Sequence, residues 1–354
     1  MSDNDLLQFF VGTISKKVDF TPQANGEGII TCHLNMHTGK IRQTAVCKEV
    51  INASYLAKCP DKNVLFAACD HPFIMGDVKA LSISKEGVLN LISTKPSEGT
   101  ITCHITCDQK GERIFVSSYF DGKLSTYKYD GKKLSSAIQV VSYSGHGPNK
   151  ERQESSHAHQ AVISPDGKWL YVCDLGSDTI WCHPLNNLKK RKGIKISPGY
   201  GPRHMVFHPN LSVSYIFCEL NAHILTMKRD DKTGNLSLLN DQPTLPKSYK
   251  GLPSGAAVKL HPSNKTLYVS NRLHDSLTVF SINESDGHLK WAQNISCAGN
   301  EPRDFAIDPI GKWLVIANQN SDALIPFELN PKTGLPTGAH GPEFHCGTPV
   351  CVVF

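Results

Sequence analysis

The stretch Ala161–Cys173, which reads AVISPDGKWLYVC, places the turn sequence Pro165-Asp166-Gly167 between two apolar segments. Pro-Asp-Gly favours a tight turn, and alternating apolar residues on both sides are typical of β-strands, so the stretch predicts an antiparallel hairpin. Similar stretches follow at Phe207–Cys218, Leu260–Ser270 and Ile307–Ala317. Repeats of about 40 to 50 residues that contain four strands are typical of β-propellers. The repeat therefore predicts an all-β protein with the propeller fold.

The number of blades follows from the first strand of each repeat, because a turn sequence marks where that strand ends. First strands are expected at residues 53–59, 101–107, 158–164, 203–208, 254–261, 303–308 and 348–354. The seventh copy lacks a second strand, and Leu7–Thr13 at the other end of the chain can supply it. We therefore expect residues 1–354 to form one seven-bladed propeller domain, closed by an N-terminal strand that completes the C-terminal blade. Such closure leaves no sheet edge exposed.

The composition narrows the class of protein. The chain has 354 residues, a net charge of +5 and 40% hydrophobic residues, enough for a sizeable core. No apolar run approaches the roughly 20 residues that a membrane helix needs. The start Met1–Asp5 is polar and lacks the charged and apolar regions of a signal peptide. We expect a cytoplasmic protein that does not bind membranes.

The cysteines and the basic residues bear on metals and nucleic acids. The 12 cysteines lie mostly within expected strands, and no Cys-x-x-Cys pair occurs. Thiols in a cytoplasmic protein are expected to be reduced, and the spacings do not fit a structural zinc site. The basic run Lys189–Lys192 lacks the interleaved aromatic residues of a nucleic-acid-binding stripe. We therefore expect no metal, no cofactor and no nucleic acid.

One connection is longer than the others. The polar stretch Ser144–Ser156 separates the second and third copies of the repeat and leads directly into His157-Ala-His159. Long loops without secondary structure of their own are usually functional. We expect this loop at the rim of a functional site.

Charged residues gather at one end of the predicted hairpins. The start of each first strand and the end of each second strand share one edge of a blade, and these edges form one face around the central channel. Antiparallel pairing, which is good to about one position, gives four opposed pairs: His159 with Asp174, Arg203 with Glu219 or its neighbour, Arg272 with Gly255, and Arg303 with Asn318. Four consecutive blades thus bring charged or titratable groups to one face, where they need partners or water.

Each pair has a structural as well as a functional interpretation. Arg203 with Glu219 can be a cross-strand ion pair, and His159 with Asp174 can anchor the long loop. His157 and His159 share a strand face and can bind a metal as neutral imidazoles, but no carboxylate on the same blade completes such a site. Arg272 faces a glycine that supplies no partner, so its guanidinium is expected to bind a carboxylate or phosphate.

Four segments together resemble a known family. Arg152–Asp178, Gly201–Pro209, Tyr268–Asp275 and Glu301–Pro309 look like, and follow the order of, motifs of the seven-bladed propeller lactonases. That family includes propeller-type 6-phosphogluconolactonases and fungal carboxymuconate-lactonizing enzymes. The resemblance is close over blades three to seven and rests on the repeat pattern alone in the first two. It implies an active site on the channel face and no metal.

The resemblance also assigns residues. The implied catalytic residues are His159, Arg203, Glu219 and Arg272. The residues expected to bind substrate or to support these four are His157, Asp174, Arg152, Gln153, His204, Arg303, Asn318 and Gln319. The chain departs from the family pattern at Ala257, where a carboxylate is usual, at Cys218, where asparagine is usual, and at Leu273, where glycine is frequent. The departure at Ala257 bears on the substrate.

These residues suit the hydrolysis of a sugar lactone or a related anionic sugar acid, with 6-phosphogluconolactone as one candidate. His159, oriented by Asp174, is the expected base at its ordinary pKa, and the arginines hold the anionic group and stabilise the oxyanion. Glu219 either positions an arginine or acts as the acid. A muconate-type cycloisomerase is the alternative enzyme, and a non-catalytic propeller that binds other proteins is the alternative of another class. We expect a monomer or a weak homodimer.

Overall fold

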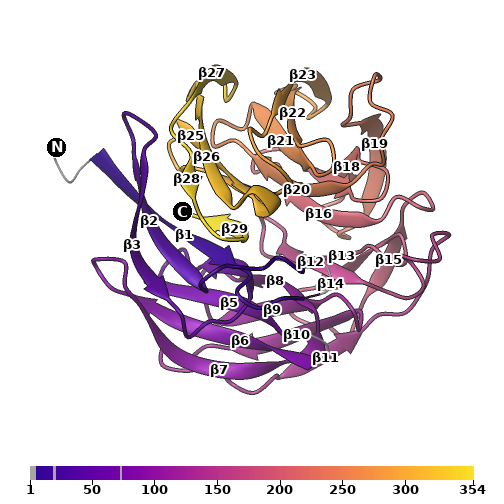
Figure 1. Cartoon of the computed structure of the whole chain (residues 1–354). Coiled ribbons are helices and arrows are strands. Elements are labelled where there is room, and N and C mark those ends of the chain that lie inside the picture. Colours follow the sequence, from indigo (N-terminus) through magenta and orange to yellow (C-terminus); the bar gives the residue numbers. More distant parts are fainter. Residues whose placement is uncertain (1–4, 19–20, 72–73) are drawn as a thin grey trace.

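The computed structural model describes residues 5–18, 21–71 and 74–354, and it places seven antiparallel sheets around a central channel (Figure 1). Blade 1 contains β4 (Ala53–Lys58), β5 (Val64–His71), β6 (Ile74–Ile83) and β7 (Leu89–Thr100). Blade 2 contains β8 (Thr102–Cys107), β9 (Arg113–Ser118), β10 (Lys123–Lys128) and β11 (Gln139–Ser142). Blade 3 contains β12 (Ala158–Ile163), β13 (Trp169–Asp174), β14 (Thr179–Pro184) and β15 (Lys192–Lys195).

The next three blades repeat this order from the channel outward. Blade 4 contains β16 (Pro202–Phe207), β17 (Val213–Cys218), β18 (His223–Arg229) and β19 (Leu236–Pro243). Blade 5 contains β20 (Gly255–Leu260), β21 (Thr266–Asn271), β22 (Ser276–Ile282) and β23 (Leu289–Ser296). Blade 6 contains β24 (Pro302–Ile307), β25 (Trp313–Asn318), β26 (Ala323–Leu329), β27 (Pro336–His340) and the short β28 (Phe344–His345), with a 3₁₀ turn at Gln319–Ser321.

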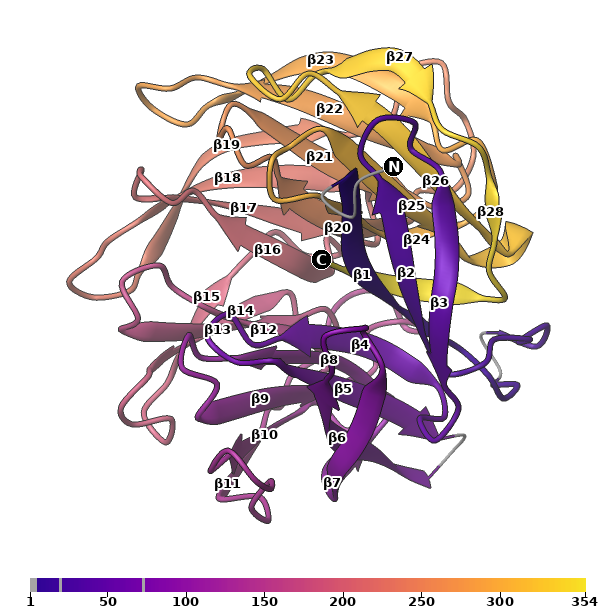
Figure 2. The same cartoon turned by 90° about the vertical axis from the view of Figure 1, so that its left-hand side faces the viewer.

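Blade 7 joins the two ends of the chain. Its strands are β29 (Pro349–Val353), β1 (Leu6–Thr13), β2 (Ile29–Asn35) and β3 (Ile41–Cys47), in that order from the channel (Figure 2). The innermost strands contact one another around a closed ring, and β29 contacts both β24 and β4. The predicted seven blades, the positions of the seven first strands and the closure by the N-terminal strand are therefore confirmed. In the described ranges, no helix is both long and apolar enough to cross a membrane.

The core lies between neighbouring blades. The second strand of each blade is buried on both faces, as in β17 and β25, where all six residues are buried, so these strands read as continuous apolar runs. Three tyrosines at the same position of successive second strands, Tyr171, Tyr215 and Tyr268, each donate a hydrogen bond to a turn glycine of the next blade. The repeat thus specifies both the blades and the contacts that hold them together.

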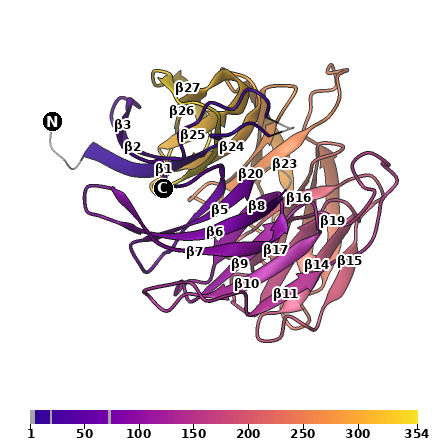
Figure 3. The same cartoon turned by 60° about the horizontal axis from the view of Figure 1, so that its bottom comes forward.

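A β-bulge recurs near the start of every innermost strand, and it positions the channel face. In blade 6, Pro302 pairs with Asn318 and Asp304 pairs with Ala317, which leaves Arg303 as the extra residue. The other six blades show a register shift at the same place. Bulges redirect side chains and end regular pairing. Figure 3 shows the inner strands β8, β16 and β20 near the centre and the outer strands β7, β11 and β15 at the periphery.

The bulges correct the register that simple alternation predicts. Asp174 pairs with Ala158 and not with His159. Pro202 pairs with Cys218, Gly255 with Asn271, and Pro302 with Asn318, so the register is shifted by one residue, which is within the predicted accuracy of about one position. His159, Arg203 and Arg303 still reach the channel face, because each is the extra residue that a bulge adds to the inner strand.

Candidate active site

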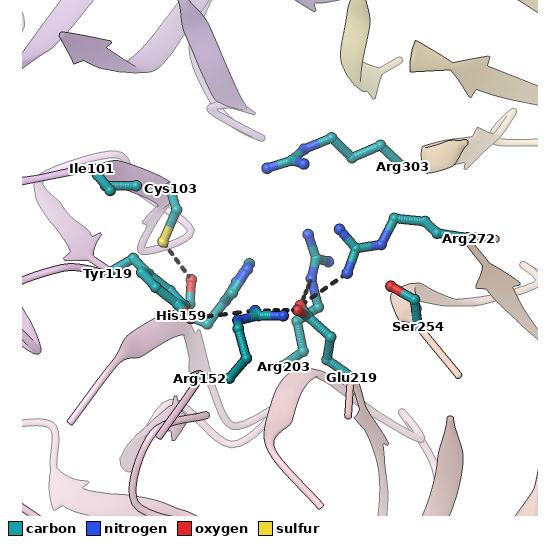
Figure 4. A pocket seen from close by; sticks show the side chains of 10 residues that line it. All are labelled: Ile101, Cys103, Tyr119, Arg152, His159, Arg203, Glu219, Ser254, Arg272 and Arg303. Atoms are coloured by element: carbon teal, nitrogen blue, oxygen red, sulfur yellow. Dashed lines mark hydrogen bonds and ion pairs between the residues drawn. The ribbon is translucent and has the colours of Figure 1, made fainter. Parts of the chain in front are cut away.

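A cavity of about 390 Å³ opens at the channel face (Figure 4). It is lined by Ile101, Cys103, Tyr119, Arg152, His159, Arg203, Glu219, Ser254, Arg272 and Arg303. These residues come from five consecutive blades, the second to the sixth, and from the loop that precedes blade 3. All four predicted catalytic residues line the cavity, together with two of the predicted supporting arginines.

Glu219 is the centre of the charged network. It follows β17 directly, and its backbone N–H donates to the Gly201 carbonyl at 2.8 Å. Its carboxylate lies 3.0 Å from Arg203 Nε and 3.1 Å from Arg272 Nη2, and Arg152 Nη2 donates to its other oxygen. Burial alone raises the pKa of Glu219, but the three guanidinium groups outweigh burial and hold it well below its ordinary value. Glu219 is therefore ionised at neutral pH, which suits a group that positions arginines and not an acid.

Arg203 and Arg272 are held on both sides of this carboxylate. Arg203 is 3% exposed and donates from Nη1 to the Ala256 carbonyl at 2.7 Å. Burial, and then the nearby Arg272, lower the pKa of Arg203 to about 10, so the guanidinium remains a cation at neutral pH. Arg272 donates to the Gly255 carbonyl at 3.0 Å and lies 3.7 Å from Glu301 Oε1. The prediction that Arg272 lacks a partner is wrong, because its carboxylate partners come from blade 4 and from the connection before blade 6.

The lining carries an excess of positive charge. Four guanidinium groups and a single carboxylate face the cavity. One of them, Arg152, comes from the polar loop, and it contacts both Tyr119 Oη, at 3.3 Å, and Glu219. The loop is thus at the rim of the cavity, as the sequence predicts. A site with this charge attracts anions, and guanidinium groups suit carboxylates and phosphates in particular.

His159 is the histidine that faces the cavity. It is 6% exposed and packs edge-on against Tyr119 and His204, with ring centroids 5.9 Å and 5.1 Å away. Its Nδ1 atom has no hydrogen-bond partner in the part of the chain that the structure describes. Burial, and then Arg203, hold the pKa of His159 well below its ordinary value, contrary to the expected unshifted pKa. The imidazole is neutral at neutral pH and can accept a proton.

Asp174 does not orient His159, which corrects a second expectation. Its carboxylate accepts hydrogen bonds from the His157 backbone N–H at 2.7 Å, from Ser177 Oγ at 2.6 Å and from Trp181 Nε1 at 2.9 Å, and it also contacts Ser156 Oγ. The physical reason is the bulge, which places Ala158 opposite Asp174 and turns His159 toward the channel. Asp174 anchors the end of the polar loop.

Two other predicted residues support that loop from outside the cavity lining. Gln153 is fully buried and donates from Nε2 to the Leu175 carbonyl at 2.9 Å. His157 stacks on the Tyr119 ring at 4.3 Å, with its Nδ1 3.0 Å from the Tyr119 carbonyl oxygen and its Nε2 3.0 Å from Glu154 Oε1. These contacts hold Arg152 and Tyr119 in place.

The remaining predicted residues differ in how close they come to the cavity. His204 is buried beside Arg203, with Nε2 3.3 Å from Arg203 Nη1, and burial followed by that guanidinium keeps its pKa well below the ordinary value. Arg303 lines the cavity and donates from Nη1 to Gln319 Oε1 at 3.3 Å. Asn318 is fully buried and donates to the Cys297 carbonyl at 2.9 Å, away from the lining.

The sequence reasoning missed Ile101, Cys103, Tyr119, Ser254 and the carboxylate of Glu301. The repeat contains the signal for most of them. In blades 2 to 7 the residue after the second strand donates its backbone N–H to the carbonyl of the residue before the first strand, as Tyr119 does to Ile101 and Arg272 to Ser254. Cys103 is the bulge residue of blade 2, equivalent to His159 in blade 3. Aligning the blades on these positions would have found them.

The departures from the family pattern lie beside the cavity, not in its lining. Ala257 is fully buried, packs in an apolar cluster with Tyr268 and Phe305, and donates its backbone N–H to Ser270 Oγ. Cys218 is buried in β17, and Leu273 is exposed. Among the described residues, no group of three or more histidine, cysteine, aspartate or glutamate side chains is arranged to hold a metal ion.

Known proteins resemble this chain along nearly its whole length. The 6-phosphogluconolactonase of Bacillus subtilis is 28% identical over 354 residues, which cover 98% of this chain and 97% of that protein. The 6-phosphogluconolactonase of Formosa agariphila is 33% identical over 327 residues, covering 89% and 92% of the two chains.

Solved structures show the same architecture. A putative 6-phosphogluconolactonase from Bacteroides fragilis superimposes with a TM-score of 0.89 at 27% identity and covers 100% of this chain and 99% of its own. The periplasmic gluconolactonase of Pseudomonas aeruginosa gives a TM-score of 0.88 at 25% identity, with 99% of each chain covered. The family model described as "Lactonase, 7-bladed beta-propeller" matches residues 8–354. This chain therefore belongs to the seven-bladed β-propeller lactonase family.

Proposed function

We propose that this protein hydrolyses the lactone of a phosphorylated sugar acid in the cavity at the channel face, with 6-phosphogluconolactone as the first candidate. The single observation that carries the proposal is a buried, neutral histidine in a cavity that four guanidinium groups line. The names of the Bacillus and Formosa relatives support the choice of substrate. A dianionic phosphate also suits an arginine-rich site.

Ring opening requires a water molecule that loses a proton and a carbonyl oxygen that gains negative charge. A ring nitrogen of His159, which lines the cavity, takes the proton as the water oxygen bonds to the lactone carbonyl carbon. Arg203, held against Glu219, stabilises the oxyanion. When the bond between this carbon and the ring oxygen breaks, the protonated His159 returns the proton to the departing alkoxide. The product is the open-chain acid, and all atoms and protons balance.

Glu219 acts in this scheme through the arginines. Its carboxylate contacts Arg152, Arg203 and Arg272, so one buried anion fixes three cations around the substrate. Guanidinium groups held in place before the substrate binds need little rearrangement during the reaction, which is the main source of electrostatic catalysis.

Two substitutions test the proposal. His159→Ala and Arg203→Ala should each lower kcat/KM for 6-phosphogluconolactone by about 100-fold or more, because one removes the base and the other the oxyanion partner. His288→Ala is the matched control, since this partly buried histidine lies outside the cavity lining and pairs with Asp286. Lactone hydrolysis is followed by acid release, and thermal melting checks folding. Full activity in both site variants would refute the proposal.

A further inference from the structure

Tyr119 is a cavity residue to which the proposed mechanism assigns no role. It follows β9 in blade 2, and its side chain lines the cavity beside His159. The two rings meet edge to face, with centroids 5.9 Å apart and an angle of 84° between their planes. In Figure 4, Tyr119 lies on one side of His159 and Arg203 on the other. The order of the blades agrees, because β12 of blade 3, which carries His159, contacts β8 of blade 2 and β16 of blade 4.

The hydroxyl group of Tyr119 has a proton to donate. Arg152 Nη2 donates to Tyr119 Oη at 3.3 Å, so the phenol oxygen is the acceptor in this contact. A phenol can also donate one hydrogen bond of its own. In the part of the chain that the structure describes, Tyr119 Oη makes no other hydrogen bond. Its O–H is therefore available to an oxygen atom of a molecule bound in the cavity.

The surroundings of Tyr119 keep its hydroxyl group protonated and hold it in place. Burial, and then the Glu219 carboxylate, raise the pKa of Tyr119 to about 12, so the phenol is uncharged at neutral pH. Its ring stacks on His157, with centroids 4.3 Å apart and planes only 3° from parallel. Its backbone N–H donates to the Ile101 carbonyl at 2.9 Å. A donor that is fixed before the substrate binds needs little rearrangement during the reaction.

The two oxygen atoms on the carbonyl carbon of a lactone gain charge at different steps. The carbonyl oxygen becomes negative when water adds, and the ring oxygen becomes negative when its bond to the carbon breaks. Both steps are faster if a hydrogen-bond donor faces the oxygen concerned. The two oxygens point in different directions from the carbon. With that carbon in front of His159 and the carbonyl oxygen toward Arg203, the ring oxygen lies toward Tyr119.

Resting on the proposed function, we propose that Tyr119 is a further catalytic residue, whose O–H donates a hydrogen bond to the lactone ring oxygen as the ring opens. The O–H bond of Tyr119 stays intact. The bond between the carbonyl carbon and the ring oxygen breaks, its electron pair goes to the ring oxygen, and the proton of the new hydroxyl group comes from His159. The hydrogen bond stabilises the alkoxide until this proton arrives. Arg152, which donates to the same phenol oxygen, makes the phenol a stronger donor.

Tyr119→Phe removes the hydroxyl group and keeps the ring that stacks on His157. For 6-phosphogluconolactone, or for the lactone that the wild-type protein hydrolyses fastest, kcat should fall about 100-fold with little change in KM, because the ring oxygen becomes a strong acceptor only as it gains charge. Tyr200→Phe is the matched control, since its hydroxyl donates to Asp241 at 2.7 Å outside the cavity lining, and it should keep wild-type kinetics. Thermal melting checks that both variants fold. An unchanged kcat in Tyr119→Phe would overturn the proposal.

Two further comparisons separate a direct role of Tyr119 from one exerted through Arg152. In an Arg152→Met background, Tyr119→Phe should lower kcat by the same factor as in the wild type, whereas a phenol that only holds Arg152 would have no further effect. The matching thiolactone has sulfur, a weak acceptor, in place of the ring oxygen, so Tyr119→Phe should slow its hydrolysis less than about tenfold.

Either of two results in these comparisons contradicts the proposal. Loss of the effect in the Arg152→Met background would make Tyr119 a positioning residue for Arg152. Equal losses for the lactone and the thiolactone would assign its hydroxyl group to the carbonyl oxygen. A wild-type protein that hydrolyses no lactone would instead refute the proposed function and, with it, this role of Tyr119.

Discussion

At the scale of the residue, the proposed mechanism depends on the protonation state of His159, which its environment controls. Burial and the Arg203 guanidinium both disfavour the imidazolium, and burial is the larger effect. A neutral imidazole is the form that accepts a proton, so the environment keeps the base ready over a wide range of pH. The same environment makes His159 a weaker base, and in the proposed mechanism the stabilisation of the oxyanion by Arg203 compensates for this in part.

The pH dependence of hydrolysis follows from this environment. Protonation of His159 would remove the proposed base, and its lowered pKa places that loss well below pH 6.5. We therefore expect kcat/KM to stay level from pH 8 to pH 6.5 and to fall only in more acidic solution. In Arg203→Met, one positive neighbour is lost, and the acid limb of the residual activity should move to higher pH. Arg203→Lys keeps the charge and should keep the limb. A wild-type limb at or above pH 6.5 would contradict this account.

Residue identities were easier to predict than residue contacts. Arg152, His159, Arg203, Glu219 and Arg272 all line the cavity as expected, because strand ends in a repeat share one face. The predicted ion pair of Arg203 with Glu219 is present, but the predictions for His159 and Arg272 were wrong for two physical reasons. Strict alternation ignores a bulge, which moved His159 away from Asp174. The register of one hairpin also contains no information on contacts between blades, and both carboxylates on Arg272 come from outside its own hairpin.

At the scale of the element, the loop before β12 and the connection after β13 fit against each other. Gly176 lies where they meet, and a Cβ atom there would be 1.8 Å from the Ser155 carbonyl oxygen and 2.9 Å from the His157 backbone nitrogen. Only glycine permits this approach of two backbones. The loop in turn places Arg152 on Glu219, so a structural requirement in one connection controls a group in the cavity.

Gly176→Ala should therefore displace the loop. We expect a loss of about 1–3 kcal/mol of stability and a fall of at least tenfold in lactone hydrolysis, because the clash is with backbone atoms that cannot rotate away. Gly193→Ala in β15, the outermost strand of the same blade, is the matched control. Its Cβ atom would contact only side-chain atoms of Thr179 and Trp181, the nearest at 3.1 Å. Thermal melting and kcat/KM are measured for both. Identical behaviour of the two variants would show that the loop does not depend on this contact.

At the scale of the whole molecule, the fold could be predicted because a propeller repeats its signals. Each blade but the last has a similar turn sequence between its first two strands, so one ambiguous copy does not change the predicted number of blades. The short strand sequence Pro349–Val353 is not followed by a turn and a second strand. Only the requirement for a closed ring predicts that it pairs with β1. Closure was predictable for the same reason that it is stabilising: an unpaired inner strand would expose both a sheet edge and apolar side chains.

The last prediction concerns that closure. A chain that ends at Thr348 lacks β29, whose Val350, Cys351 and Val352 are at most 3% exposed. Burial of such side chains contributes roughly 1.5–3 kcal/mol each, so the loss is comparable with the total stability of about 5–15 kcal/mol for a folded protein. The contacts of β29 with β4 and β24 disappear as well, and the ring opens. We expect this variant to show no cooperative melting by circular dichroism.

A chain lacking only Phe354 is the control, because it keeps all of β29 and should melt cooperatively. Its melting temperature should fall only slightly, from the loss of the ring contact between Phe354 and Phe9, whose centroids lie 5.3 Å apart. Equal melting of the two truncated chains would show that the ring is stable without its C-terminal strand.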